Sequence, residues 1–225
     1  MATKIFRGLI LGAPASGKGT ISDRMVKKFN LVHISSGDKL RQQIQDKTPI
    51  GLEAQKYIKD GKLVPDDVMI KFIADELKQV HNKSWLLDGF PRTLSQAEAL
   101  WEIAKLDLAV NLVVPFQVII DRVKGRWVHL PSGRVYNEGF NAPKVPGVDD
   151  VTGEPLIQRD DDKPEVVSKR LEQYEKLTKP VAEFYRGKGI LKEFKGATSD
   201  DIWRRMLACL AVHMPLHFST QDSKL

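Results

Sequence analysis

The chain has 225 residues, 42% of them hydrophobic and 28% charged, which indicates one globular unit with insertions, or two small domains, able to bury a core. No apolar run approaches the roughly 20 residues that cross a bilayer, and the apolar start of the chain belongs to a predicted strand, so we expect no membrane association. The single cysteine, Cys209, excludes a disulfide framework, and the net charge of +6 leaves nucleic acid, anionic surfaces and phosphorylated small molecules as candidate partners.

Strand patterns and helix patterns alternate along the chain. We predict strands over residues 5–11, 31–34, 85–87, 108–114 and 190–194. We predict helices over residues 19–29, 66–80, 94–104, 116–123, 164–185 and 200–213. One face of the longest helix carries Val167, Leu171, Tyr174, Leu177 and Val181. The alternation predicts an α/β fold in which helices cover both faces of a five-stranded parallel sheet.

The first predicted strand runs into a glycine-rich turn, GAPASGKGT, over residues 12–20. A strand, a glycine turn, a lysine and a helix in this order are typical of a phosphate-binding loop. Gly12, Gly17 and Gly19 would let backbone N–H groups turn inward, and Lys18 would supply a charge for the outer phosphates. The general pattern has Ser or Thr directly after the lysine, whereas here the hydroxyl comes at Thr20; the alternative is a plain turn with a chance lysine.

Residues 126–163 break the alternation, because they are rich in Pro, Gly, Asp and Asn and have little helical period. An insert this long without regular structure is uncommon in a compact domain unless it is functional. We therefore predict a small β-rich lid. The polar tail, residues 215–225, is expected to be frayed.

Several arginines follow predicted strands or lie near the predicted lid. They are Arg41, Arg92, Arg122, Arg126, Arg159 and Arg170. Singly, each is more often a solvated surface charge than a ligand. Because the ligand crevice of a parallel sheet lies at the carboxyl ends of its strands, beside the phosphate loop, we predict that these arginines converge there. Arg122 and Arg126 would share a helix face if the helix over 116–123 extends that far.

Together these motifs resemble the adenylate kinase family, in its type with a long lid. The resemblance covers nearly the whole chain and is carried by GAPASGKGT, SSGDKLR, DGFPRT, GRWVHLPSGRVYN, FNAPK and DDVTGEPLIQRDDDKPE. Within the family the chain is most similar to the mitochondrial matrix type that uses GTP, on the basis of Ile21, SWLLDGFPRT, GRWVH and Trp203.

The resemblance implies a P-loop kinase fold and reversible transfer of the γ-phosphoryl group of a nucleoside triphosphate to AMP, with Mg2+ accompanying the nucleotide. GTP or ITP is the expected donor. The alternatives are ATP as donor, a uridylate or cytidylate kinase, and a nucleotide-binding module without catalysis. A nucleic-acid-dependent ATPase would need a basic stripe with stacking aromatics, which the sequence lacks, so we expect no nucleic-acid partner. We expect a monomer in the mitochondrial matrix, with the cytoplasm as the alternative.

The resemblance also implies three regions and their site residues. The regions are a core with the P-loop (1–34, 65–124 and 164–225), an AMP-binding insert (35–64) and a lid (125–163). The implied donor-binding residues are Gly12, Ala15, Ser16, Gly17, Lys18, Gly19, Thr20, Arg122, Arg126 and Tyr136. The implied AMP-binding residues are Ser36, Arg41, Leu63, Val64, Gly89, Arg92, Gln96, Arg159 and Arg170, with Gln96 reading the adenine edge. The implied catalytic residues are Lys18, Arg92, Arg126, Arg159 and Arg170.

Asp88 is expected to orient magnesium through water; the alternative is a cap for the next helix. Two residues depart from the family pattern. Ala15 stands where the family usually has Gly, and it would be strained if its φ is positive. Ala142 replaces a Pro in the lid, which should loosen the lid only slightly.

Some relatives hold the lid with a four-cysteine zinc site. The matching positions here are His129, Ser132, Asp149 and Thr152, which predict a hydrogen-bonded polar network and no structural zinc. Cys209 lies far from the lid in the sequence. We predict that Cys209 is a core residue, on one helix face with Ile202, Met206 and Leu210.

Overall fold

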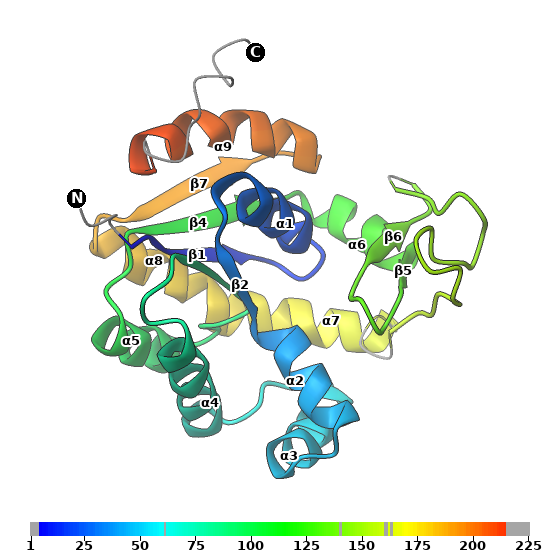
Figure 1. Cartoon of the computed structure of the whole chain (residues 1–225), viewed down its shortest axis with the longest axis horizontal. Helices are drawn as coiled ribbons and strands as arrows, with labels where there is room; N and C mark the ends of the chain where they lie inside the picture. Colours follow the sequence, from blue (N-terminus) through cyan, green and yellow to red (C-terminus); the bar gives the residue numbers. More distant parts are fainter. Residues whose placement is uncertain (1–4, 61, 140, 160–161, 163, 215–225) are drawn as a thin grey trace.

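A parallel five-stranded sheet runs through the molecule, as predicted (Figure 1). Its strand order, β2-β3-β1-β4-β7, comes from the structure. Its strands are β1 (Arg7–Gly12), β2 (Val32–Ser35), β3 (Trp85–Asp88), β4 (Leu108–Val113) and β7 (Leu191–Lys195). The computed structural model describes residues 5–60, 62–139, 141–159, 162 and 164–214, so the predicted frayed tail lies outside it. The inner strands β1, β3 and β4 are buried almost throughout, as a sheet covered on both faces requires.

Helices cover both faces of this sheet (Figure 1). On one face, α1 (Lys18–Phe29) and α9 (Ser199–His213) pack on β-strand residues such as Ile10 and Val110. On the other face lie α4 (Asp66–Gln79), α5 (Leu94–Ile103) and α8 (Lys179–Gly187). Alternate residues of a strand point to opposite faces, which is why Leu9 and Ile10 belong to different core clusters.

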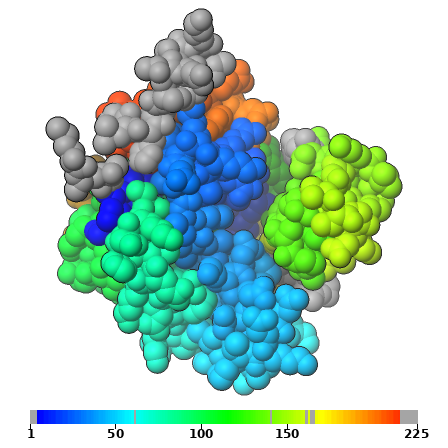
Figure 2. All heavy atoms as spheres, in the orientation of Figure 1, coloured from blue at the N-terminus to red at the C-terminus, as the bar shows by residue number. Residues whose placement is uncertain are grey.

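Two insertions project from this core. The first is the helix pair α2 (Ser36–Gln45) and α3 (Pro49–Ile58), which follows β2. The second follows α6 (Phe116–Lys124) and contains the antiparallel strands β5 (Arg126–Val128) and β6 (Val135–Asn137). Figure 2 shows this second insertion, the lid, standing apart from α2 and α3 with a hollow between them. The chain therefore places two projecting parts on either side of the carboxyl ends of the strands.

The helix predicted over 164–185 changes its winding partway. It consists of α7 (Pro164–Gln173), a π-helical turn η2 (Tyr174–Thr178) and α8. A π turn has more residues per turn than an α-helix, so side chains within it leave the α-helical register. Leu177 lies in this turn and is 43% exposed, so its predicted place on the buried face is wrong, whereas Val181 beyond the turn is buried as predicted. The residue after Leu177, Thr178, lines a pocket.

Two smaller points also differ from what the sequence suggested. The condition for a helix face shared by Arg122 and Arg126 is not met, because α6 ends at Lys124 and Arg126 begins β5. Cys209 lies beside the buried stripe of α9 and not on it; it is half-buried, and burial raises the pKa of its thiol. None of the helices that the structure describes combines the length and apolar content that a bilayer span needs.

Candidate active site

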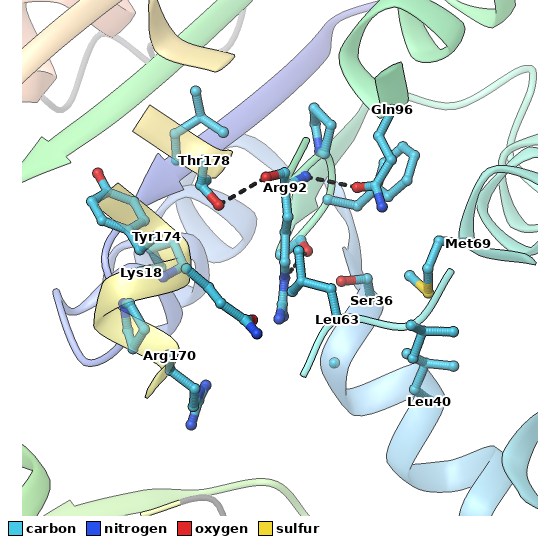
Figure 3. Close-up of a pocket in the computed structure, with 18 of the residues that line it drawn as sticks. Lys18, Ser36, Leu40, Leu63, Met69, Arg92, Gln96, Arg170, Tyr174 and Thr178 are labelled. Atoms are coloured by element: carbon cyan, nitrogen blue, oxygen red, sulfur yellow. Dashed lines mark hydrogen bonds between the residues drawn. The ribbon is translucent and has the colours of Figure 1, made fainter. Parts of the chain in front are cut away.

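A pocket opens at the carboxyl ends of β1 and β3, between the sheet, α2 and the η2 turn (Figure 3). The predicted site residues that line it are Gly12, Lys18, Ser36, Arg41, Leu63, Val64, Gly89, Arg92, Gln96 and Arg170. The predicted residues outside this lining are Ala15, Ser16, Gly17, Gly19, Thr20, Asp88, Arg122, Arg126, Tyr136 and Arg159. The pocket thus gathers almost all the predicted AMP-binding residues around Lys18.

The loop over residues 12–20 depends on glycine at two of its three glycine positions. Gly12 and Gly17 have positive φ angles of 149° and 92°. The φ of Gly17 favours glycine, and a Cβ there would also lie 2.7 Å from Ser199 Oγ, which would have to move. Gly19 differs, because it lies within α1 and a Cβ on it would meet no described atom within 4 Å. Gly19 therefore needs no special backbone conformation, and the predicted contribution of its N–H group to phosphate binding stays a prediction.

Ala15, which stands where the family usually has Gly, has its backbone in the left-handed region. Its φ is 57°, a value that costs an L-residue roughly 1–2 kcal/mol relative to the right-handed region. We expect Ala15→Gly to raise the free energy of unfolding by about 0.5 kcal/mol, since the greater freedom of glycine in the unfolded chain offsets part of the relief. This corresponds to roughly 1–2 °C in Tm, measured by calorimetry.

Ala13→Gly is the matched control, two residues away in the same loop. Ala13 is buried against α6 and α7, and its φ is not positive, so glycine there should lower Tm. Equal falls in Tm for both variants would contradict the strain assigned to Ala15.

Lys18 begins α1 and points back over the loop. Its Nζ donates to the carbonyl oxygens of Gly12 and Ala13, each at 2.9 Å. Burial lowers the pKa of Lys18 to about 8; the Asp88 carboxylate opposes this shift, whereas Arg92 and Arg170 add to it. The ammonium group is thus held among other cations at a helix N-terminus, an arrangement that favours an anion.

Asp88 ends β3 close to this ammonium group. Its side chain is buried, and burial raises its pKa against the opposing charge of Lys18. The capping alternative is wrong, because Thr93 caps α5 by accepting a hydrogen bond from the N–H of Gln96 at 3.2 Å. No cluster of three or more candidate metal ligands occurs among the described residues. A lone carboxylate here fits Mg2+ that keeps its waters and phosphate ligands, as Mg2+ commonly does.

Two serine hydroxyls at the site are buried and find no hydrogen-bond partner among the described residues. Ser16 lies in the loop and Ser36 lines the pocket, and both side chains are 1% exposed. Buried hydroxyls without partners are uncommon in proteins, so they indicate a place where a polar ligand completes the hydrogen bonding.

Two of the predicted arginines, Arg126 in the lid and Arg170 on α7, lie close to one buried carboxylate, Asp162. Arg126 binds it with both ends of its guanidinium group, through Nε at 2.7 Å and through Nη2. Arg170 Nη1 lies 4.0 Å from the same carboxylate. The sequence run RDDDK contains Asp162, but its pairing with Arg126 depends on a fold contact and not on spacing.

Asp38, on the predicted AMP-binding insert, lies close to two arginines, as Asp162 does. Arg41 pairs with it one helical turn away, and Arg159 Nη2 lies 4.0 Å from it. The Arg41 guanidinium holds the pKa of Asp38 below its ordinary value, against the effect of burial. Arg122 instead donates to the carbonyl oxygens of Ala15 at 3.1 Å and Ala197 at 2.9 Å, and so ties α6 to the loop.

Arg92 is fixed from three sides (Figure 3). Its Nε donates to Gly89 O at 2.7 Å, its carbonyl accepts from Thr178 Oγ1 at 2.9 Å, and its N–H donates to Gln96 Oε1 at 2.7 Å. Thr178 was not predicted as a site residue. A helical pattern carries no signal for a π turn, so sequence reasoning could not find Thr178.

The lid is held by a polar network centred on Asp149, which confirms the predicted network. Asp149 is 2% exposed and accepts from Arg134 Nη2 at 2.6 Å, Arg134 Nε at 2.8 Å and Thr152 Oγ1 at 2.9 Å. The bonds from Arg134 hold the pKa of Asp149 well below its ordinary value. His129 lies 2.7 Å from Ser132 Oγ through Nδ1, and 2.6 Å from Glu154 Oε2 through Nε2.

Tyr136 belongs to the same network. Its hydroxyl donates to Asp149 Oδ1 at 2.9 Å and accepts from the N–H of Asp150 at 2.9 Å. The hydroxyl thus serves the lid, and a contact of Tyr136 with nucleotide would use its ring or backbone. That contact stays a prediction.

Comparison with known proteins agrees with this geometry. The family model described as adenylate kinase matches residues 10–190. The chain is 55% identical over 206 residues to "GTP:AMP phosphotransferase, mitochondrial" of Drosophila melanogaster, an alignment that covers 92% of this chain and 95% of the fly protein. It is 49% identical over 214 residues to the protein of the same name from Saccharomyces cerevisiae, covering 91% of this chain and 92% of the yeast protein.

Proposed function

The chain belongs to the adenylate kinase family, and on that premise we propose that it transfers the γ-phosphoryl group of GTP or ITP reversibly to AMP. The observation that carries the proposal is the convergence of Lys18, Arg92 and Arg170 on one pocket beside the glycine-rich loop (Figure 3). Phosphoryl transfer requires mainly positioning and charge stabilisation from a protein, which fixed cations and a phosphate loop supply.

In the proposed reaction, an oxygen of the AMP phosphate attacks the γ-phosphorus of the donor. The bond from that phosphorus to the β-phosphate oxygen breaks, giving ADP and the donor's diphosphate. The loop N–H groups and Lys18 would hold the donor phosphates, and Arg41 and Arg92 would hold the AMP phosphate. Mg2+ carried by the donor would neutralise phosphate charge, with Asp88 orienting it through water.

Arg126, Arg159 and Arg170 would act on the transferring group. Arg126 and Arg170 now face Asp162, and Arg159 faces Asp38. Phosphate oxygens offer guanidinium groups the same bidentate geometry with more charge, so we infer that bound nucleotide draws these arginines inward. Closure of the lid (125–163) and the insert (35–64) on the core would exclude water, which competes as an acceptor.

The remaining assignments follow the named relatives. These relatives are named as mitochondrial proteins, and we propose the mitochondrial matrix for this chain, with the cytoplasm as the alternative. The partners we propose are nucleotides alone, bound by a monomer, with neither nucleic acid nor membrane. ATP as donor is the alternative within the family. A non-catalytic module is disfavoured because each proposed catalytic cation is present.

Initial rates for GTP, ITP and ATP against AMP, CMP and UMP test the proposal. We expect AMP to be strongly preferred as acceptor, and kcat/KM for GTP or ITP to exceed that for ATP by about tenfold or more, since a mispaired buried polar group is costly. A higher kcat/KM for ATP than for GTP would make ATP the preferred donor and would leave the assignment as a kinase unchanged. Absence of transfer for every pair would overturn the kinase assignment itself.

A further inference from the structure

Gln96 is held by the protein at both ends of its side-chain amide. It is 2% exposed and lies in the wall of the pocket, on the far side of Arg92 from Lys18 (Figure 3). Its Oε1 accepts the N–H of Arg92 at 2.7 Å, and its Nε2 donates to Asp66 Oδ1 at 2.7 Å. A backbone N–H can only donate and a carboxylate only accepts, so these partners permit one of the two amide orientations.

Asp66 is itself fixed. Its Oδ2 accepts from Thr93 Oγ1 at 2.7 Å, so its two oxygens serve two different donors of α5. It also lies in the first turn of α4, where the helix dipole favours a negative charge. Asp66 is outside the pocket lining, and of its two partners only Gln96 lines the pocket.

The pocket beside this amide suits a flat base. Leu40, Val64 and Met69 line it and are each nearly fully buried. Each end of the amide keeps one further hydrogen-bonding position, an N–H on Nε2 and a lone pair on Oε1. An apolar slot with one hydrogen-bond donor and one hydrogen-bond acceptor in fixed positions can distinguish heterocycles by the polar groups on their edges.

A 6-aminopurine and a 6-oxopurine present opposite patterns to such an amide. The 6-aminopurine accepts at N1 and donates from its amino group, whereas the 6-oxopurine donates at N1 and accepts at O6. The fixed amide matches the first pattern. To match the second it must turn over, which would set its N–H groups against the Arg92 N–H and its oxygen against the Asp66 carboxylate, at a side chain that is itself 2% exposed.

We propose that Asp66 is a positioning residue that makes the acceptor site select AMP over IMP and GMP, by fixing the orientation of the Gln96 amide. The proposal rests on the proposed function, because it concerns the acceptor of that reaction. The inference adds to the proposed function a residue that determines specificity without touching the substrate.

The test is the ratio of kcat/KM for AMP to that for IMP, together with Kd values for AMP and IMP measured by calorimetry without donor. Asp66→Leu, of similar size, removes one of the two groups that fix the amide and leaves the Arg92 N–H as the other. We expect the AMP to IMP ratio to fall by about tenfold or more through a higher KM for AMP and a lower KM for IMP, with kcat for AMP changed little. Asp66→Asn keeps one acceptor oxygen and should fall between Asp66→Leu and the unmodified chain.

Asp67→Leu is the matched control, since it removes the neighbouring exposed carboxylate from the same helical turn and should leave the ratio unchanged. If Asp66→Leu does not fold, Asp66→Asn carries the test. An unchanged AMP to IMP ratio in the folded variants, in rates and in Kd, overturns the role of Asp66. If the unmodified chain transfers no phosphoryl group but binds AMP over IMP, and the variants lose that preference, the proposed function fails while this inference stands.

Discussion

Lys18→Ala is expected to lower kcat for transfer from GTP to AMP by about 10²-fold or more, the scale for removing one preorganised charge at a reacting centre. The ammonium group now rests on two loop carbonyls among Asp88 and the cations Arg92 and Arg170. A moving γ-phosphoryl group would draw it from these carbonyls to the site where charge develops. Arg92→Ala and Arg159→Ala should lower kcat by a similar factor.

Lys27→Met is the control, because Lys27 is an exposed lysine in the last turn of the same helix. It should leave kcat unchanged. Turnover close to that of the unmodified chain in two of the three variants Lys18→Ala, Arg92→Ala and Arg159→Ala, with the fold intact by circular dichroism, would remove these residues from the catalytic site.

The pH dependence of donor affinity distinguishes a charge role of Lys18 from a structural one. The pKa of Lys18 in the ligand-free protein is about 8, lowered from its ordinary value by burial. Lys18 is therefore charged below pH 8 and loses its proton above it. Donor affinity should be flat below pH 8 and fall above it in the unmodified chain, whereas Lys18→Ala should show no fall in this range.

The parts of the site predicted from the sequence are those whose signal is local. A glycine turn between a strand and a helix identifies the phosphate loop, because strand, turn and Lys18 are neighbours in the chain. The sheet follows from alternating patterns in the same way. Even the strain at Ala15 was foreseeable, since a single backbone position decides it.

The parts that sequence reasoning missed depend on contacts between distant segments. Asp66 and Gln96 are 30 residues apart, and only the packing of α4 on α5 brings them together. The π turn at Tyr174–Thr178 leaves the apolar spacing of the helix intact in the sequence, so the exposure of Leu177 has no local signal. The pairing of Arg126 with Asp162 could not be predicted either, because Asp162 is one of three consecutive aspartates and the sequence does not show which of them is buried.

The lid gives the second large effect that we expect. Asp149→Ala should lower Tm by several degrees and weaken donor binding more than AMP binding. Asp149 accepts hydrogen bonds from the side chains of Arg134, Tyr136 and Thr152 and from the N–H groups of Val151 and Thr152, and its removal leaves all these donors without that acceptor. A satisfied polar network of this kind fails sharply when one member is lost. Calorimetry gives Tm, and titration with each nucleotide gives the two Kd values.

Asp150→Ala is the matched control, because Asp150 is exposed and, within the described part of the lid, its side chain accepts only the N–H of Lys144. It should change Tm little. Equal effects of Asp149→Ala and Asp150→Ala would show that the buried network does not hold the lid.

The same network predicts how the lid responds to metal removal. His129, Ser132, Asp149 and Thr152 already bind one another or neighbouring lid residues, and they offer one imidazole and one carboxylate where a closed zinc site uses four ligands, commonly thiolates. A strong chelator, followed by restored Mg2+ for the assay, should therefore leave Tm and activity unchanged. Stoichiometric zinc in the purified protein, lost on chelation together with activity, would contradict this, because a metal holding the lid makes its binding free energy part of folding.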